Sequence, residues 1–254
     1  MGELAGKVAV VTGGSGALGS VIARALATAG ASVLLVGRDA TRLAEAVKAV
    51  TDAGGKAVEC NADITSDDGP HKIVDAALEA FGRLDILVNS AGHFAWTKLL
   101  DIADEDWFEA LDVNVTAPFR LMRAAAKHMI GQGQGGAILN IGSIHAMIGD
   151  GTIVPHCASK AALHGLTLAA ADGLRAHGIR ANLIHPGQIA KDSGDRHAEG
   201  PDELVTQADI AAMALHLCSD ACASVTGSAV EMFGKTRSLV GGASYSSRAS
   251  SSRE

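Results

Sequence analysis

The sequence is poor in cysteine, and its four thiols are scattered over 254 residues. So few cysteines exclude a disulfide-based scaffold and favour a reducing, cytoplasmic environment. Basic residues are also scarce, since 21 Lys and Arg stand against 28 Asp and Glu, for a net charge of −7. This deficit argues against a nucleic-acid-binding protein, which needs a basic face to neutralise phosphates. The apolar runs are too short for a signal peptide or a membrane span, so no membrane partner is expected.

Apolar residues make up 48% of the chain and occur in short runs separated by segments of helical spacing. The runs are mostly continuous rather than alternating, which is typical of parallel strands buried on both faces. Segments with helical spacing lie between them, for example at Leu18, Ile22, Ala25 and Leu26. This order predicts an α/β fold with one doubly wound parallel sheet and helices on both faces. The seven expected strands cover residues 7–12, 32–36, 56–61, 84–89, 137–141, 179–185 and 229–233.

The composition changes clearly only at the C-terminal end. Residues 241–254 are rich in serine and nearly free of apolar side chains, and such a segment cannot build a packed core. We therefore expect one folded domain over residues 1–240 and a disordered tail over residues 241–254. Within the domain, Asp39 and Ser66 stand just before helical segments and are expected to cap them.

A glycine-rich turn follows the first expected strand. Gly14, Gly16 and Gly19 fit the pattern G-x-G-x-x-G between a strand and a helix. Glycines at such a turn let backbone N–H groups and the helix N-terminus approach a pyrophosphate. A glycine pattern alone is weak evidence, but its position in the first strand–helix unit predicts a dinucleotide site. A tight turn without a ligand is the alternative.

Several motifs in this order resemble those of the short-chain dehydrogenase/reductase family. The family's TGxxxGxG turn matches Thr12, Gly13 and Gly19, with Ala17 in place of its middle glycine, and its NNAG segment matches residues 89–92 with one substitution. The resemblance covers almost the whole expected domain and implies a Rossmann-type fold that binds a nicotinamide dinucleotide. It also implies that Asp63 holds the adenine amine. The cofactor contacts that it implies are Gly13, Ser15, Gly16, Leu18, Gly19, Arg38, Asp63, Ile64, Asn89, Ala91, Gly92, Lys160, Pro186, Gly187 and Ile189.

The end of the second expected strand bears on the choice of cofactor. An acidic residue there would accept hydrogen bonds from both ribose hydroxyls of NAD, whereas an arginine can pair with the 2′-phosphate of NADP. Gly37 takes the acidic position and Arg38 follows it. We therefore expect NADP(H) to be favoured over NAD(H). A solvated Arg38 is the alternative, and the glycine turn itself lacks a second basic residue because Gly16 occupies that place.

The resemblance further implies a catalytic row of Asn, Ser, Tyr and Lys. Asn114, Ser143 and Lys160 match three of these positions. The tyrosine should lie thirteen residues after the serine and four before the lysine, and both counts lead to His156. The only tyrosine in the chain is Tyr245, in the expected tail, so no shifted alignment restores it.

Histidine at this position changes the expected proton chemistry. Imidazole can act as a general acid or base, with an unperturbed pKa of about 6.5. A second positive charge one helical turn from Lys160 is disfavoured, so we expect His156 to be mostly neutral at pH 7. It would then serve as a base or hydrogen-bond donor rather than as a cationic acid. If the general acid is lost, a rate factor of roughly 10²–10⁴ goes with it, while dinucleotide binding survives.

Other polar and aromatic residues fall near the same cleft by family position. The histidines among them lack the spacing of metal ligands, so pocket lining is favoured over a metal site. His185, just before Pro186, is placed at this cleft as well. Asp150 is a candidate either to orient His156 or to face solvent. The expected substrate-pocket residues are His93, Phe94, Trp96, His145 and Asp150.

The segment after Gly187 departs from the family pattern. Lys191 stands where the family has a threonine, and residues 192–206 form a short, polar stretch. Such a stretch is expected to form a small or mobile lid over the substrate. The last expected strand also ends differently from those of many relatives.

Together these residues indicate an NADP(H)-dependent oxidoreductase that acts on the carbonyl/alcohol pair of a small molecule. Two alternatives stay open: a lyase, isomerase or cyclase with His156 as general base, and a catalytically weak dinucleotide-binding scaffold. Retention of Asn114, Ser143 and Lys160 favours chemistry over scaffolding. The family usually assembles through two long helices, here expected near residues 105–130 and 153–176, which implies a homo-oligomer, either a dimer or a tetramer.

Overall fold

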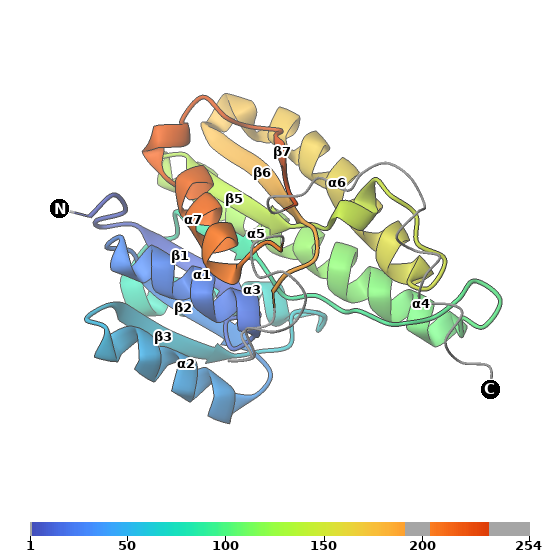
Figure 1. The fold of residues 1–254 in the computed structure, drawn as a ribbon. Helices are drawn as coiled ribbons and strands as arrows, with labels where there is room; N and C mark the ends of the chain where they lie inside the picture. The colour runs from blue at the N-terminus through green and yellow to red at the C-terminus, as the bar shows by residue number, and fades with distance from the viewer. Residues whose placement is uncertain (1, 191–203, 234–254) are drawn as a thin grey trace.

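The computed structural model describes residues 2–190 and 204–233, and within them strands and helices alternate along the chain (Figure 1). The strands are β1 (Val8–Thr12), β2 (Ser32–Gly37), β3 (Lys56–Asn61), β4 (Ile86–Asn89), β5 (Gly136–Ile141), β6 (Ile179–Pro186) and β7 (Ala229–Met232). The helices are α1 (Ala17–Thr28), α2 (Ala40–Asp52), α3 (Gly69–Phe81), α4 (Asp104–Leu111), α5 (Ala117–Gln132), α6 (Val154–Leu174) and α7 (Gln207–Cys218). The α/β fold expected from the apolar runs is confirmed.

The strands form one parallel sheet in the order β3-β2-β1-β4-β5-β6-β7. Ala9 of β1, for example, pairs with Val33 of β2 on one side and with Ile86 of β4 on the other. The strand order therefore reverses at β1 and β4. In sheets of this kind ligands bind in the crevice beyond the carboxyl ends of the strands at the point of reversal. The topology thus places the expected dinucleotide site above β1 and β4.

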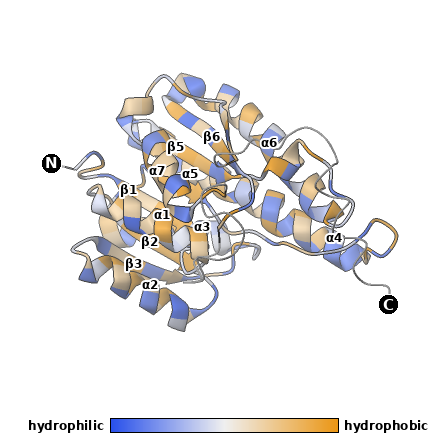
Figure 2. Cartoon of the chain, viewed as in Figure 1, coloured by the Kyte–Doolittle hydropathy of each residue, from blue (hydrophilic) through white to orange (hydrophobic). Residues whose placement is uncertain are grey.

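Helices cover both faces of the sheet because each strand supplies two buried layers. Val11 of β1 belongs to the core cluster that also contains Ile22 of α1 and Ile210 of α7. Its neighbour Val10 points to the opposite face and joins the cluster that contains Ile73 of α3. Successive strand residues point to opposite faces, so a continuous apolar run fills both layers. Figure 2 shows β5 largely in orange and α2 in a mixture of blue and orange.

One of the two expected helix caps is confirmed and the other is wrong. Asp39 accepts a hydrogen bond from the backbone N–H of Arg42 at 3.1 Å and caps α2. Ser66 does not cap α3, since that helix begins three residues later, after Asp68. The Ser66 hydroxyl instead donates to the carbonyl oxygen of Asp63 at 2.9 Å and stabilises the turn that separates β3 from α3.

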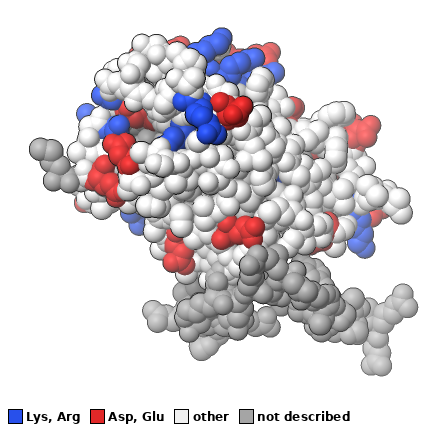
Figure 3. Space-filling model, turned by 90° about the horizontal axis from the view of Figure 1, so that it is seen from above, with Lys and Arg blue, Asp and Glu red and all other residues white. Residues whose placement is uncertain are grey.

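Acidic and basic side chains are interspersed in small groups on the face of the molecule in Figure 3. Among the residues that the structure describes, no helix combines the length and the apolar character needed to cross a membrane. The expected tail over residues 241–254 lies outside the described residues, and so do Lys191 and most of the expected lid.

Candidate active site

The glycine turn between β1 and α1 is packed too closely for larger residues at several positions. Gly13 has a φ of +64°, and a Cβ atom there would lie 2.9 Å from the Cα atom of Ala91. A Cβ atom on Gly19 would collide with the carbonyl oxygen of Gly13. The helix α1 begins directly after Gly16, which has no side chain to cap it. The N–H groups of the first helical turn can therefore receive an anion, and the turn fits the pyrophosphate of a dinucleotide.

The segment after β4 is fixed beside this turn by Thr12. Its hydroxyl oxygen accepts hydrogen bonds from the backbone N–H groups of Ser90 and Ala91, each at 3.1 Å. The Asn89 side chain is buried and donates to the side-chain oxygen of Asn140 in β5 at 2.8 Å. Residues 89–92 therefore form the floor of the crevice at the point where the strand order reverses.

Two arginines flank the side of the turn where the resemblance places the adenosine ribose. The carbonyl oxygen of Arg38 accepts a hydrogen bond from Asn61 at 3.1 Å, which fixes the backbone after β2. The guanidinium of Arg42 donates to the carbonyl oxygen of Ser15 in the glycine turn at 3.2 Å. Sequence reasoning missed Arg42 because it sought a second basic residue within the turn itself. Arg42 could have been found from its position, one helical turn after Asp39, which caps α2.

Asp63, the residue implied for the adenine amine, is bound into a local turn. Its Oδ1 atom accepts hydrogen bonds from the backbone N–H of Thr65 at 2.9 Å and from the hydroxyl of Thr65 at 2.7 Å. These hydrogen bonds lower the pKa of Asp63. The carboxylate is therefore charged at neutral pH, and Oδ2 is the oxygen left to receive an adenine amine.

Asn114 lies in a short π-helical segment, η1 (Asp112–Thr116), between α4 and α5. The long helix expected near residues 105–130 is observed as an unbroken helical stretch of α4, η1 and α5, in which η1 is the π-helical part. The amide of Asn114 accepts from the backbone N–H of His93 at 2.8 Å and donates to its carbonyl oxygen at 2.9 Å. It also donates to the hydroxyl of Ser159 at 2.9 Å. Asn114 thus joins the segment after β4 to helix α6.

His156 and Lys160 lie one turn apart on α6, and both are buried. The Lys160 ammonium donates to the carbonyl oxygen of Ile141 at 2.8 Å, at the end of β5. Burial lowers the pKa of Lys160 to about 8. Burial and then the charge of Lys160 lower the pKa of His156 to about 4, against a smaller opposing effect of the His93 backbone. His156 is therefore neutral at pH 7, as the sequence predicted.

The aromatic residues expected in the pocket lie on one side of His156. The ring of Phe94 meets the His156 ring edge to face, with centroids 4.7 Å apart. Trp96 packs in the same way on Phe94 at 5.2 Å but remains 74% exposed. Phe94 therefore contacts the catalytic row, whereas Trp96 forms part of its rim. The Nδ1 atom of His156 is buried and has no hydrogen-bond partner among the described residues.

Ser143, His145 and Asp150 follow one another on the other side of the row. The Ser143 hydroxyl lies 3.4 Å from Nδ1 of His145, and Nε2 of His145 lies 4.0 Å from Oδ2 of Asp150. The Asp150 side chain is 11% exposed. The Asp150 carboxylate therefore lies against His145 and is largely shielded from solvent.

His185 supports the cleft from below and does not line it. It is fully buried, and its Nδ1 atom accepts the backbone N–H of Ser143 at 3.0 Å. Its Nε2 atom lies 3.1 Å from Nδ1 of His164. Burial and then His164 lower the pKa of His185 to about 4. His93, in turn, has its Nδ1 atom 3.5 Å from Glu109.

The sequence matches a family model described as short chain dehydrogenase over residues 7–203. The chain belongs to this family. An uncharacterized oxidoreductase from Methylorubrum extorquens is 35% identical over 251 residues, which cover 93% of this chain and 100% of that protein. The 2-dehydro-3-deoxy-D-gluconate 5-dehydrogenase of Escherichia coli is 37% identical over 188 residues, 74% of each chain. The crystal structure of an NAD⁺-bound xylitol dehydrogenase is similar with a TM-score of 0.84 and 27% identity, covering 91% of this chain and 99% of that one.

Membership in the short-chain dehydrogenase family confirms the family resemblance and the Rossmann-type fold, and it identifies the chain as an oxidoreductase that uses a nicotinamide dinucleotide.

The Pro186–Ile189 segment, implied to contact the nicotinamide, is bonded to neighbouring segments. Gly187 donates to the carbonyl oxygen of Met232 at 2.8 Å, and Ile189 pairs with Val205. The described histidines, cysteines and acidic residues include no group of three or more that could hold a metal ion.

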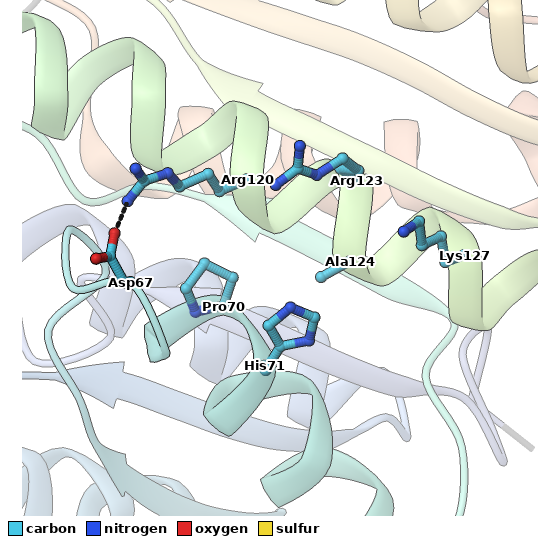
Figure 4. Close-up of a pocket in the computed structure, with 7 residues that line it drawn as sticks. All are labelled: Asp67, Pro70, His71, Arg120, Arg123, Ala124 and Lys127. Atoms are coloured by element: carbon cyan, nitrogen blue, oxygen red, sulfur yellow. Dashed lines mark ion pairs between the residues drawn. The ribbon is translucent and has the colours of Figure 1, made fainter.

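A separate hollow of about 230 Å³ lies between α3 and α5 of this short-chain dehydrogenase (Figure 4). Arg120 on its wall forms an ion pair with Asp67 at 3.2 Å. The lining includes none of the residues of the catalytic row and contains exposed cations, so we do not place the reaction there. The lining residues are Asp67, Pro70, His71, Arg120, Arg123, Ala124 and Lys127.

Proposed function

We propose that this short-chain dehydrogenase is an NADP(H)-dependent oxidoreductase that acts on the carbonyl/alcohol pair of a small molecule. The observation that carries the proposal is that Asn114 is bonded to Ser159 of α6, the helix that carries His156 and Lys160, and that Lys160 is bonded to the end of β5, two residues before Ser143, beside a glycine turn that fits a pyrophosphate. When bound, the nicotinamide supplies or accepts the hydride at the substrate carbon. The protein's part is to hold the reacting oxygen and to manage its proton.

Each residue of the row has a distinct task in this proposal. The Ser143 hydroxyl holds the reacting oxygen, and the neutral imidazole of His156 provides a second hydrogen bond to that oxygen. Lys160 is mostly protonated at pH 7, because its lowered pKa of about 8 still lies above neutrality. Its positive charge stabilises the negative charge that develops on the oxygen. The family resemblance also implies that Lys160 binds the nicotinamide ribose. Asn114 keeps α6 in place against the His93 backbone.

The preference for NADP(H) rests on Arg38 and gains support from Arg42, whose guanidinium bonds to the glycine turn. One similar structure, xylitol dehydrogenase, is described as bound to NAD⁺, so the preference needs a direct measurement. A charge-assisted hydrogen bond contributes about 1.5–3 kcal/mol, so the Kd for NADP⁺ should rise roughly 10- to 100-fold in Arg38→Ala.

Calorimetric titration with NADP⁺ and with NAD⁺ measures both affinities, and the exposed Arg24 of α1 provides the control variant Arg24→Ala. The Kd for NAD⁺ should stay constant in both variants. Equal affinity of the wild-type protein for the two cofactors, or an unchanged NADP⁺ affinity in Arg38→Ala, would remove the argument from Arg38.

Hydride transfer is favoured over a non-redox reaction with His156 as general base. An imidazole with a pKa of about 4 is a weak base at neutral pH, which suits a hydrogen-bonding role better. The deciding experiment incubates the protein with NADPH and a panel of ketones, aldehydes and quinones and follows the nicotinamide absorbance. Consumption of NADPH that matches product formation supports the proposal. A product formed without NADPH consumption would point to the lyase, isomerase or cyclase alternative.

We further propose a homo-oligomer that assembles through α4, α5 and α6. Phe108, Phe119 and Leu168 on these helices are exposed apolar side chains, and Phe108 is 60% exposed. Burying such side chains against a second copy would be favourable.

All four cysteines lie in the described part of the chain and are free thiols, which supports a reducing, cytoplasmic location. A single domain over residues 1–240 remains part of the proposal.

A further inference from the structure

We propose that Ser143, His145 and Asp150 form a proton relay that connects the reacting oxygen with solvent. The inference rests on the proposed function, because it requires Ser143 to hold the oxygen of the carbonyl/alcohol pair. It assigns to His145 the exchange of protons with water. His156 occupies the position of the family's catalytic tyrosine but serves only as a hydrogen-bonding group.

The environment of His156 makes it a poor carrier of protons. Its side chain is buried and lies one helical turn from the positive charge of Lys160, so the addition of a second proton to the ring is unfavourable. Loss of the proton from a neutral imidazole is more difficult still. The Nδ1 atom has no hydrogen-bond partner among the described residues that could pass a proton onward. Reduction of a carbonyl at neutral pH therefore needs a proton donor other than His156.

The second imidazole in the cleft has the partners that His156 lacks. The Ser143 hydroxyl oxygen accepts the backbone N–H of His145 at 3.2 Å, and the hydroxyl lies 3.4 Å from Nδ1 of the same ring. With Nδ1 as the acceptor of the serine hydrogen, the ring carries its own hydrogen on Nε2. That atom faces Oδ2 of Asp150 at 4.0 Å. The order serine, imidazole, carboxylate is the arrangement in which histidine takes a proton from a serine hydroxyl.

The carboxylate of this group is held in a fixed position. Oδ1 of Asp150 accepts hydrogen bonds from the backbone N–H and the hydroxyl of Thr152 at 2.8 and 2.7 Å. The His145 side chain is 28% exposed, whereas Ser143 is buried. His145 thus connects the buried Ser143 hydroxyl with solvent, beside the Asp150 carboxylate.

The proposed step balances in both directions. In alcohol oxidation, the substrate O–H bond breaks and its proton moves to the Ser143 oxygen as the serine proton moves to Nδ1 of His145. The C–H bond gives its electron pair and hydrogen as hydride to an oxidised nicotinamide dinucleotide, and the C=O bond forms. The imidazolium beside Asp150 then releases one proton to water. In carbonyl reduction the same transfers run in reverse, with the proton drawn from water through His145.

The first test replaces His145 by glycine and supplies imidazole in solution. We expect kcat of His145→Gly to fall about 100-fold, with the Kd for NADPH unchanged, and added imidazole to restore much of the lost rate. His71→Gln, on the exposed surface of α3, is the matched control and should retain full activity with no response to imidazole. Undiminished kcat in His145→Gly, or a loss that imidazole does not relieve, would overturn the relay.

The second test is read on the wild-type protein and does not depend on turnover. A two-bond ¹H–¹⁵N spectrum of the wild-type protein, labelled at histidine, reports which ring nitrogen carries the hydrogen, and His145→Gln identifies the signal. We expect the Nε2–H form of His145, and the Nδ1–H form would contradict the relay geometry. If the wild-type protein reduced no carbonyl compound at all, the proposed function would fail. If it turned over normally without His145, only the relay would fail.

Discussion

The His156 ring packs against Phe94 and lies one helical turn from Lys160. A substitution can therefore keep the packing of the ring and remove its hydrogen bond. In His156→Phe the packing against Phe94 can persist, but the hydrogen bond to the reacting oxygen is lost. We predict that kcat falls about 10²- to 10³-fold, as for loss of one oxyanion donor. The Kd for NADPH should stay constant because the glycine turn and Lys160 are unchanged. Steady-state assays and fluorescence titration measure the two quantities.

The exposed His216 on α7 provides a control for this substitution. His216→Phe should leave both quantities at the wild-type value. Full activity of His156→Phe would show that the imidazole has no part in the reaction.

Two buried histidines also make the stability of the fold depend on pH. The pKa of His156 and of His185 is lowered to about 4 from an ordinary value of 6.5. Between these values the unfolded chain binds more protons than the folded chain, so the free energy of unfolding falls as the pH drops through this window. Above pH 6.5 the full contribution is present. From pH 7 to pH 5 each histidine accounts for a loss of about 2 kcal/mol.

Urea unfolding at the two pH values provides the measurement. His156→Gln should lose about 2 kcal/mol less than the wild-type protein between pH 7 and pH 5, whereas the exposed control His216→Gln should lose as much as the wild type. An identical pH dependence in His156→Gln would mean that the ring is not held neutral by its burial.

The turn between β1 and α1 accepts no side chain at several of its glycines. A Cβ atom on Gly19 would collide with the carbonyl oxygen of Gly13, so Gly19→Ala must displace the helix from the turn. Overpacking of this kind costs about 1–3 kcal/mol, and the displaced N–H groups should bind NADP⁺ at least about tenfold more weakly. Calorimetric titration and urea unfolding measure both effects.

The matched variant is Gly131→Ala in α5, where no described atom lies within 4 Å of the added Cβ atom. It should leave NADP⁺ affinity unchanged and stabilise the protein slightly, because alanine favours a helix more than glycine does. Wild-type affinity in Gly19→Ala would contradict the anion-binding role of the turn.

Elements whose residues are buried on both sides could be predicted from the sequence, and elements shaped by distant contacts could not. The apolar run expected at residues 32–36 predicts β2, which the structure extends by one residue to Gly37, because four consecutive buried residues fit a strand covered on both faces. The π-helical segment η1 has no such local signal. It depends on the hydrogen bonds of Asn114 to His93 and Ser159, which lie 21 and 45 residues away. The contacts of His185 with Ser143 and His164 could not be predicted for the same reason, because these partners come from packing.

At the scale of the whole molecule, the order of strands brings together residues that are far apart in the chain. Family spacing placed Asn114, Ser143 and Lys160 at one cleft, and the carboxyl ends of parallel strands meet at one edge of the sheet. What spacing could not reveal is which side chains touch. Ser143 contacts His145 and His185, and neither pair follows from a motif.

The exposed apolar side chains of α4 and α6 bear on how whole molecules assemble. If Phe108 and Leu168 are covered by a second copy, a glutamate at either position would bury a charge without a partner, and buried charges of this kind are strongly unfavourable. We predict that Phe108→Glu and Leu168→Glu are monomers at micromolar concentration, whereas the wild-type protein is an oligomer, as measured by light scattering. Because both side chains are exposed in the single chain, unfolding of the monomer should change little. Leu100→Glu, at a loop position that is 95% exposed, should remain an oligomer. A monomeric wild-type protein would exclude assembly through these helices.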